Sequence, residues 1–320
     1  MNRITPITLC AVATILSFLP FARAADAPIA SDTPQASDTS ESSDGPEALA
    51  TTETGGQQEY YAVPAGENQI IGNVTLKDGD KTTKLDYVVR PDGDAVFEGD
   101  IILGDFTQMS QLGQNETQLA GLSDPGLLGL FRRGNHLWPQ GKVRYVIDGA
   151  LPNPGRITQA IAHWESKTPI RFEAITAETG NYIRFIVDPQ GGCSSSVGMM
   201  GGRQFVKLGT ACSKGNVIHE IGHALGLGHE HIRADRNNFI TVKTENIKPG
   251  MESQFSIKPE IYMNVGPYDY GSIMHYDKRA FSKNGQLTII SPNPIIGQRN
   301  ALSPSDICVI KTMYAMQMPC

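Results

Sequence analysis

The sequence predicts an α+β fold, and three observations lead to this prediction. Short strand-like runs separated by Asp-Gly turns occupy residues 59–128. A strand, a helix, three strands and a second helix follow one another between residues 137 and 226, which is the pattern of an α+β lobe. Residues 237–320 show little regular pattern before one last helix. The chain of 320 residues is 40% hydrophobic, so it can build a sizeable core.

Residues 1–24 have the three parts of a secretory signal peptide. Arg3 supplies a positive charge, residues 4–20 form an apolar stretch, and residues 22–24 read Ala-Arg-Ala, an A-x-A cleavage site. The alternative is a transmembrane anchor, but the apolar stretch is short and prolines interrupt it. No later stretch is long and apolar enough to span a bilayer. We therefore expect a secreted protein, either extracellular or periplasmic in transit.

Residues 25–58 are acidic, low in complexity and free of Lys and Arg. They lack the apolar side chains needed to offset the entropy cost of ordering the chain, so we expect a disordered linker. From residue 59, short apolar or alternating runs flank the turns Asp78-Gly79 and Asp92-Gly93, which suggests small hairpins. Residues 105–130 show no strong pattern, and this block is too thin to predict an independent domain.

The pattern strengthens from Leu137 onward. Lys142–Ile147 reads as a strand, and Arg156–Lys167 reads as an amphipathic helix because its apolar residues recur at i, i+3, i+4 and i+7. Three more runs read as strands: residues 170–175, 182–187 and 204–208. The next helix is capped by Ser213 or Asn216, and the last clear helix spans about residues 305–316.

The most specific motif is H-E-x-x-H-x-x-G-x-x-H, formed by His219, Glu220, His223, Gly226 and His229. Residues four apart share one face of a helix, so the first two imidazoles can bind one zinc ion. A helix continued to residue 229 would place the third imidazole about 15 Å along the axis from the first. We therefore expect the helix to end at Gly226, so that the chain turns back. Three His ligands leave one position for water, which is typical of a catalytic site with one zinc ion per chain.

Glu220 follows the first ligand, and in this motif a Glu acts as general base on the zinc-bound water. It would take a proton as water attacks the carbonyl and pass it to the leaving amine. The alternative interpretation is a set of ordinary helix residues. It is disfavoured because the extended motif fixes three His, one Glu and one Gly at once.

This stretch resembles the metzincin signature and, more narrowly, the astacin family. Two runs carry the resemblance: H-E-H-I-R-A-D-R at residues 229–236, and the Met-turn S-I-M-H-Y at residues 272–276. The resemblance covers about residues 137–314, and we assign residues 134–320 to one protease domain. It implies a metzincin-like domain with two lobes. The N-terminal lobe would hold a mixed twisted sheet and two helices, and the C-terminal lobe would be mostly irregular with a terminal helix.

The resemblance also implies roles for single residues. Met274 would form a hydrophobic floor beneath the metal. Tyr276 would be an extra zinc ligand in the resting enzyme and would then stabilise the tetrahedral intermediate as a hydrogen-bond donor; the alternative is a purely structural Tyr. Glu230 would tie the site to the mature amino terminus or to neighbouring backbone.

Phe97-Glu98-Gly99-Asp100 resembles the F-x-G-D motif of astacin propeptides. The resemblance implies that Asp100 is a zinc ligand of the latent form, that residues 59–133 are a propeptide, and that the chain is inhibited by its own propeptide. The alternative is an ordinary turn Asp. An activating protease would cleave between Asp100 and Trp138, and Arg132-Arg133 is one candidate position.

Loss of the signal peptide removes Cys10 and leaves four cysteines, for which three pairings are possible. Proximity in the chain favours Cys193–Cys212 and Cys308–Cys320; free thiols are the alternative. The astacin resemblance supports the first pair. Many astacins pair the C-terminal cysteine with one that stands where this chain has Pro169, so here Cys308 is the simplest partner for Cys320.

The net charge of −6 and the absence of a basic stripe give no reason to expect a nucleic-acid partner. We expect a secreted zinc endopeptidase, made as a zymogen, that binds protein or peptide substrates along an edge strand. The rivals are a non-catalytic zinc- or peptide-binding module and an amidase of cell-wall peptides.

Overall fold

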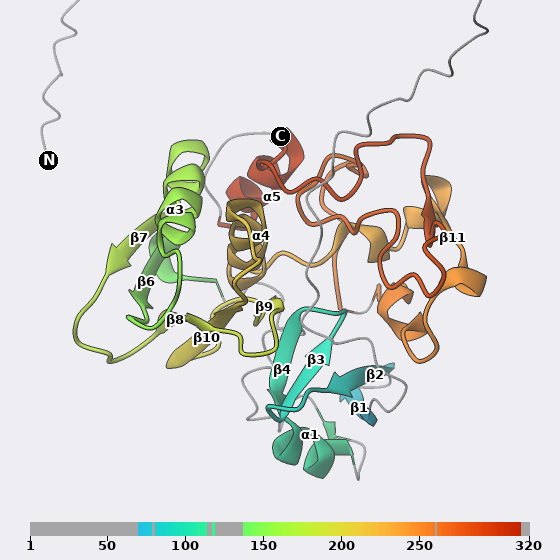
Figure 1. The fold of residues 1–320 in the computed structure, drawn as a ribbon, viewed down its shortest axis with the longest axis horizontal. Coiled ribbons are helices and arrows are strands. Elements are labelled where there is room, and N and C mark those ends of the chain that lie inside the picture. Colours follow the sequence, from blue (N-terminus) through green and yellow to red (C-terminus); the bar gives the residue numbers. More distant parts are fainter. Residues whose placement is uncertain (1–69, 79–80, 114–116, 119–136, 260, 315–320) are drawn as a thin grey trace, which may run out of the picture. The chain divides into compact units, whose positions relative to one another are not determined.

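A computed structural model describes residues 70–78, 81–113, 117–118, 137–259 and 261–314 (Figure 1). They all belong to one compact unit, Thr52–Cys320. The predicted signal peptide, acidic linker and Arg132-Arg133 cleavage position lie outside the described residues. None of the helices in the described part of the chain combines the length and apolar character needed to cross a bilayer.

A mixed sheet of ten strands runs through the described residues in the order β5-β1-β2-β3-β4-β9-β10-β8-β6-β7. Its first half comes from an N-terminal block, residues 70–118, and its second half from a C-terminal region, residues 137–314. The halves meet where β4 pairs in parallel with β9 through Ile101 and Ser195 (Figure 1). Figure 1 shows the block, in blue to green, with its strand β4 next to β9. Edge pairing between two segments distant in sequence therefore joins the block to the rest of the sheet.

The N-terminal block contains the predicted hairpins. Its elements are β1 (Ile70–Asp78), β2 (Lys81–Val89), β3 (Asp94–Phe97), β4 (Ile101–Asp105), α1 (Phe106–Gly113) and β5 (Thr117–Gln118). Successive strands β1 to β4 pair antiparallel. Its core also contains Val197 and Ile261, which belong to the C-terminal region. The block therefore looks thin in sequence because part of its apolar core is supplied from elsewhere in the chain.

The first lobe of the C-terminal region follows the predicted order. After the short turn η2 (Pro139–Gly141) come β6 (Lys142–Ile147), α3 (Gly155–Lys167), β7 (Arg171–Ala174), β8 (Tyr182–Val187), β9 (Cys193–Ser195), β10 (Arg203–Leu208) and α4 (Lys214–Ala224). Strands β6, β7, β8 and β10 pair in parallel, whereas β9 is antiparallel to β10. Helix α3 packs against α4, which also contacts β9 (Figure 1). The indole N–H groups of Trp138 and Trp164 donate to the α4 carbonyls of Ala224 and Ile218.

The second lobe is mostly irregular, as predicted. It contains the 3-10 turns η3 (Glu230–Ile232), η4 (Arg236–Asn238), η5 (Thr244–Asn246) and η6 (Glu252–Phe255), the two-residue strands β11 (Thr241–Val242) and β12 (Ile289–Ile290), and helix α5 (Pro304–Met313). Ser303 caps α5 through a capping box with Asp306. Buried Asp306 also accepts hydrogen bonds from the Ser272 hydroxyl and the Ile273 N–H. The Met-turn is therefore fixed by the first turn of α5.

Candidate metal centre and active site

Helix α4 presents the first two histidines and ends where the motif predicts. Ser213 caps its start through a capping box with Asn216. At its end Gly226 adopts φ +107° and its N–H donates to the His223 carbonyl at 2.8 Å. The Leu227 N–H closes the turn on the Gly222 carbonyl at 3.0 Å. This left-handed ending turns the chain back toward the helix.

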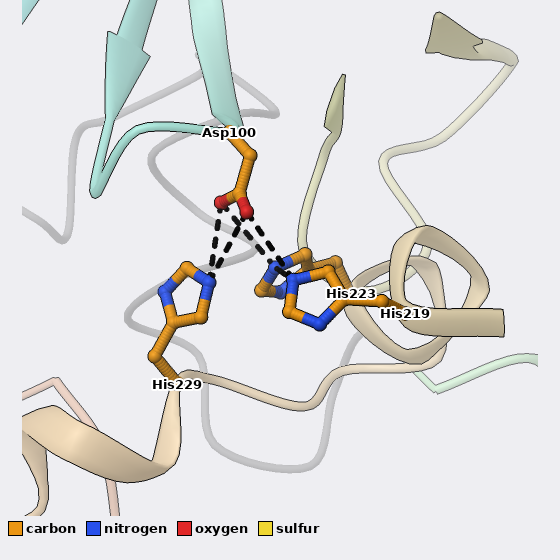
Figure 2. Close-up of side chains that lie close together, drawn as sticks. All are labelled: Asp100, His219, His223 and His229. Carbon is orange, nitrogen blue, oxygen red and sulfur yellow. Dashed lines mark hydrogen bonds and ion pairs between the residues drawn. The ribbon is translucent and has the colours of Figure 1, made fainter. Parts of the chain in front are cut away.

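The turn brings His229 beside His219 and His223, and Asp100 reaches the same point from the corner between β3 and β4 (Figure 2). One donor atom from each of these four buried side chains lies within 4.8 Å of the other three. The His219 and His223 Nε2 atoms are 3.1 Å apart. The predicted convergence of the three imidazoles is therefore present, and a carboxylate from the N-terminal block lies among them.

The hydrogen bonds of the three rings fit a bound cation. The Nδ1 atoms of His219 and His223 face the carbonyls of Ile273 and Leu227, each at 2.8 Å, so both Nδ1 atoms carry the proton. Their Nε2 lone pairs then face each other at short range, which is repulsive unless a cation lies between them. Burial lowers the pKa of His229 to about 4, which keeps that ring neutral and able to ligate. Buried Asp100 Oδ1 makes no hydrogen bond to any described residue, so it has a lone pair to offer.

Glu220 lies beside this centre and is buried. Its Oε2 atom makes no hydrogen bond within the described part of the chain. Burial raises the pKa of Glu220 well above its usual range, and the charges of Asp100 and Asp188 raise it further. A carboxyl group in such surroundings accepts a proton readily, which suits a general base.

The Met-turn lies directly under helix α4. A Cβ atom added at Gly222 would lie 2.7 Å from the Met274 sulfur, so glycine lets the methionine approach the helix backbone. Met274 also accepts the Glu230 N–H at 3.1 Å through its carbonyl. The turn therefore holds both α4 and the residue that follows the third histidine.

Tyr276 is fully buried, and its hydroxyl donates to the backbone carbonyl of Glu98. Its ring stacks on His231, with centroids 3.6 Å apart, and meets the His229 ring edge-on at 4.8 Å. Burial raises the pKa of Tyr276 well above its usual value, so the hydroxyl remains protonated and can donate. In this structure Tyr276 donates to the N-terminal block, and its predicted role as a zinc ligand stays a prediction.

The family is decided by the sequence comparison. The model of the Astacin peptidase family matches residues 131–315, more than half of the chain. The chain belongs to the astacin family. The family consists of zinc-dependent metalloendopeptidases, and the fold is the α+β two-lobed fold that the sequence predicted.

Individual relatives agree with this assignment. Zinc metalloproteinase nas-14 of Caenorhabditis elegans is 38% identical over 241 residues, covering 68% of this chain and 47% of that protein. Tolloid-like protein 1 of Homo sapiens is 40% identical over 195 residues, covering 57% of this chain and 19% of that protein. High choriolytic enzyme 1, a hatching enzyme zinc-protease of Oryzias latipes, has a TM-score of 0.50 at 34% identity, covering 56% of this chain and 92% of that chain. The chain spans about half or less of the length of these two curated relatives.

In this astacin-family chain, Glu230 contacts neighbouring backbone, one of the two predicted alternatives. Its Oε1 accepts the Asp269 N–H at 2.7 Å, and burial raises the pKa of Glu230 to about 8. It also borders a cavity of about 410 Å³ that is lined by Leu137, Met274 and Met313 among others.

Sequence reasoning missed two contacts that the N-terminal block makes with the astacin domain. Glu98 accepts the Nδ1 proton of His229 at 3.0 Å, so the block holds the His229 ring as well as Tyr276. Arg90 forms a buried ion pair with Asp188 at 2.6 Å. The charged residues of the run Arg90-Pro-Asp-Gly-Asp were the available signal, but the sequence does not identify their partners.

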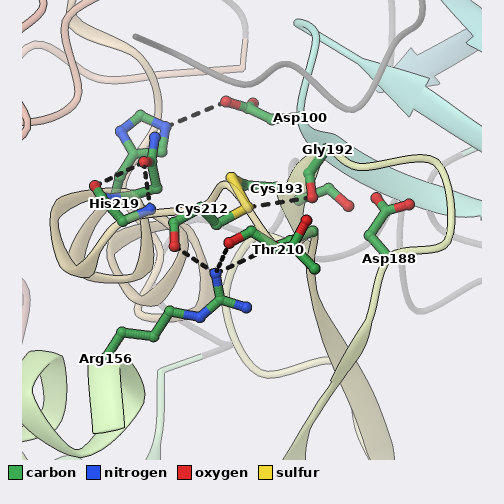
Figure 3. The surroundings of a disulfide bond; sticks show 12 residues. Asp100, Arg156, Asp188, Gly192, Cys193, Thr210, Cys212 and His219 are labelled. Carbon is green, nitrogen blue, oxygen red and sulfur yellow. Dashed lines mark hydrogen bonds and ion pairs between the residues drawn. A yellow bond between two sulfur atoms is a disulfide. The ribbon is translucent and has the colours of Figure 1, made fainter. Parts of the chain in front are cut away.

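The predicted Cys193–Cys212 disulfide is confirmed (Figure 3). It joins β9 to the residue before the Ser213 cap of α4. The Arg156 guanidinium donates to the carbonyls of Gly209 and Cys212, so it holds the segment that leads to this disulfide. The bridge therefore ties strand β9 to the start of helix α4. Cys308 is disulfide-bonded as well. Cys320 lies outside the described residues, so the Cys308–Cys320 pairing stays a prediction.

Proposed function

We propose that this chain is a secreted zymogen and that its N-terminal block is an inhibitory propeptide. The endopeptidase activity is proposed from the family, and the latency from the structure. One observation carries it: the Asp100 carboxylate lies among the three imidazoles, where substrate and water would have to bind. Residues 1–24, acting as a signal peptide, would direct the zymogen out of the cytoplasm and would then be removed.

Three histidines and Asp100 would hold the zinc ion of the latent form: His219, His223 and His229 supply nitrogen, and Asp100 supplies oxygen. Zinc held in this way supplies a Lewis acid that activates water and polarises a peptide carbonyl. Asp100 occupies the position that water needs in the active enzyme. Removal of the block would open that position while leaving His219 and His223 held by their own backbone partners, Ile273 and Leu227.

In the active form, Glu220 would take a proton from water as it attacks and return it to the leaving amine. Tyr276 would lose its acceptor, the Glu98 carbonyl, when the block leaves. Its protonated hydroxyl could then turn toward the scissile carbonyl and donate to the oxygen that gains charge. The block would thus suppress the attack of water and the action of Tyr276, because Asp100 excludes the water and Glu98 holds the tyrosine.

Substrate would bind as an extended segment along β9, the strand that β4 covers in the zymogen. The Ser195 N–H now donates to the Asp100 carbonyl at 2.9 Å, and a peptide backbone could take that bond over. Activation would need an activating protease that cleaves between Asp100 and Trp138. The new amino terminus could then reach Glu230 through the adjacent cavity near Leu137.

The decisive experiment compares the activities of intact zymogens to which no protease has been added. Asp100→Ala should cleave casein as the intact chain at least tenfold faster than wild type, since loss of one ligand opens the position for water. Asp86→Ala, which removes a partly exposed carboxylate of the same block, is the control. Amino-terminal sequencing and zinc analysis must show intact chains that hold metal. Equal latency of Asp100→Ala and wild type would contradict the proposed inhibition.

A non-catalytic binding module would keep zinc and bind peptides but cleave neither casein nor gelatin after activation. A cell-wall amidase would prefer peptidoglycan peptides to proteins. Retention of Glu220 at the centre disfavours the first, because binding alone does not need a base.

A further inference from the structure

A buried acid lies at the end of β8, away from the metal ligands. Asp188 and its partner Arg90 both have side chains that are 0% exposed, and Arg90 Nη2 donates to Asp188 Oδ1 at 2.6 Å. The same oxygen accepts the Gln190 N–H at 2.8 Å. Asp188 Oδ2 makes no hydrogen bond to any residue that the structure describes. The acid therefore has one oxygen fixed and one still able to accept.

The surroundings of Arg90 form a three-sided cradle for a guanidinium. Asp188 receives Nη2, the Gln190 side-chain oxygen receives Nε at 3.1 Å, and the Ser194 hydroxyl lies 3.5 Å from Nη1. The three acceptors belong to the astacin domain, and the cation belongs to the N-terminal block. A planar guanidinium fits acceptors spread in this way better than an ammonium does.

This cradle lies beside β9, the strand along which substrate is proposed to bind. Ser194 is the central residue of β9, and the next residue, Ser195, donates to the Asp100 carbonyl beside the metal centre. Asp188 is also close enough to Glu220 for its charge to raise the pKa of that carboxyl. Figure 3 shows Asp188 on the loop that leads to Gly192 and Cys193.

Departure of the block would leave Asp188 without its cation. A carboxylate that has lost its counter-charge attracts another cation, and a guanidinium can take over the donor positions that Arg90 leaves. We propose that Asp188, Gln190 and Ser194 form a substrate subsite for an arginine side chain, and that Arg90 fills this subsite in the zymogen. This inference rests on the proposed function, because it requires that the block leaves and that substrate follows β9.

The test uses the full chain after activation by limited proteolysis. The substrates are neutral fluorogenic peptides in which one arginine is moved through each position around the scissile bond. In a matched set, citrulline, which has the shape of arginine without its charge, replaces the arginine. At one position, wild-type kcat/KM should be at least tenfold higher for arginine than for citrulline. Asp188→Asn should bring that ratio close to one, because it removes the negative charge that distinguishes arginine from citrulline. The Asn oxygen can still accept the Gln190 N–H, which preserves the loop.

Two further variants keep the test decisive. Gln190→Ala should lower the arginine-to-citrulline ratio in part, and it supplies the answer if Asp188→Asn does not fold. Glu173→Gln, which removes an exposed carboxylate on β7, the last strand of the sheet, should leave the ratio unchanged. Equal cleavage of arginine and citrulline peptides by wild type at every position would overturn the subsite while leaving the protease function intact. No cleavage of any peptide would overturn the proposed function and the subsite with it.

Discussion

The two sides of the metal centre reach it by different routes. On one side, His219 and His223 lie four residues apart on one helix, and backbone carbonyls of the same domain orient their rings. On the other side, Asp100 arrives at His219 from 119 residues away, carried by a strand pairing between β4 and β9. The first arrangement lies within the astacin domain and keeps its own support, whereas the second exists only while the block is docked.

His229 lies between these two cases. The turn at Gly226 places it, but its Nδ1 atom is held by Glu98 of the N-terminal block. Second partners of this kind orient a ligand ring and raise its basicity. The comparison therefore predicts that changes on the helix side abolish the chemistry, and that changes on the block side release it or loosen the docking.

The largest effect is expected on the helix side, at Glu220. Glu220→Ala in the activated enzyme should lower kcat by roughly 10²–10⁴-fold, because a positioned general base contributes that much. Zinc content should stay equal to that of wild type, since Glu220 is not a ligand. Peptide hydrolysis and metal analysis on the same sample check both statements. Loss of zinc together with activity would mean that Glu220 helps to bind the metal, and it would contradict the role of general base.

The next largest effect is expected on the block side, at Arg90. Removing one partner of a buried ion pair costs about 3–5 kcal/mol, because the remaining charge stays buried without compensation. Arg90→Ala should therefore weaken docking of the block in the zymogen. Hydrogen exchange of β4 and the unfolding free energy of the zymogen measure this.

Lys84→Ala is the matched control for Arg90→Ala. Its ion pair with Asp86 is 3.5 Å long, and the two side chains are 60% and 33% exposed. Exposed pairs contribute at most about 1 kcal/mol, so this change should be nearly silent. Similar effects of the two substitutions would mean that burial does not distinguish the Arg90 pair.

A third prediction separates the two regions by pH. None of the seven histidines lies in residues 70–118, so histidine titration acts on the C-terminal region. His275 donates from Nδ1 to the Tyr276 carbonyl at 2.7 Å and accepts the Tyr268 hydroxyl at Nε2, also at 2.7 Å. Burial lowers the pKa of His275 to about 4 from the usual 6.5.

The sign of this pH effect follows from proton binding. Between pH 6.5 and 4 the unfolded chain binds the proton of residue 275 and the folded chain does not, so protonation favours unfolding. The stabilising contribution is fully present above pH 6.5 and declines by about 3 kcal/mol as the pH falls to 4. The unfolding free energy of wild type and His275→Gln, measured across this range, gives the share of residue 275. Parallel curves would show that His275 is not the group responsible.

The same contrast explains what could be predicted from the sequence. Strands β6 and β8 have the predicted bounds, and α3 begins one residue earlier than predicted, because alternation and helical periodicity are local signals. The end of α4 was predicted because glycine determines it. The two strands, the helix and the helix end could be predicted because each depends only on residues that are neighbours in the sequence.

The missed features depend on distant partners or are short. Strand β9 has three residues, too few for an alternating pattern. Helix α1 has eight residues, and it is stabilised by packing Met109 into the core of the block. The contacts of Glu98 and Arg90 join residues 131 and 98 positions apart, and charge alone does not identify their partners.

The smallest effect is expected at the cap of α4, and it tests whether the helix side is supported locally. Ser213 accepts the Asn216 N–H at 3.2 Å, so Ser213→Ala should destabilise the protein by about 1 kcal/mol. Ser110→Ala in α1 is the control, because this hydroxyl donates to the Thr107 carbonyl within the helix and caps nothing. Thermal unfolding gives the energy, and hydrogen exchange gives its location. Faster exchange should be confined to the first turn of α4, with β4 unchanged, because the hydrogen bond that is lost joins Ser213 to Asn216 within this helix end. Faster exchange of β4 would mean that docking of the block depends on this helix end, and that the two sides of the site are coupled.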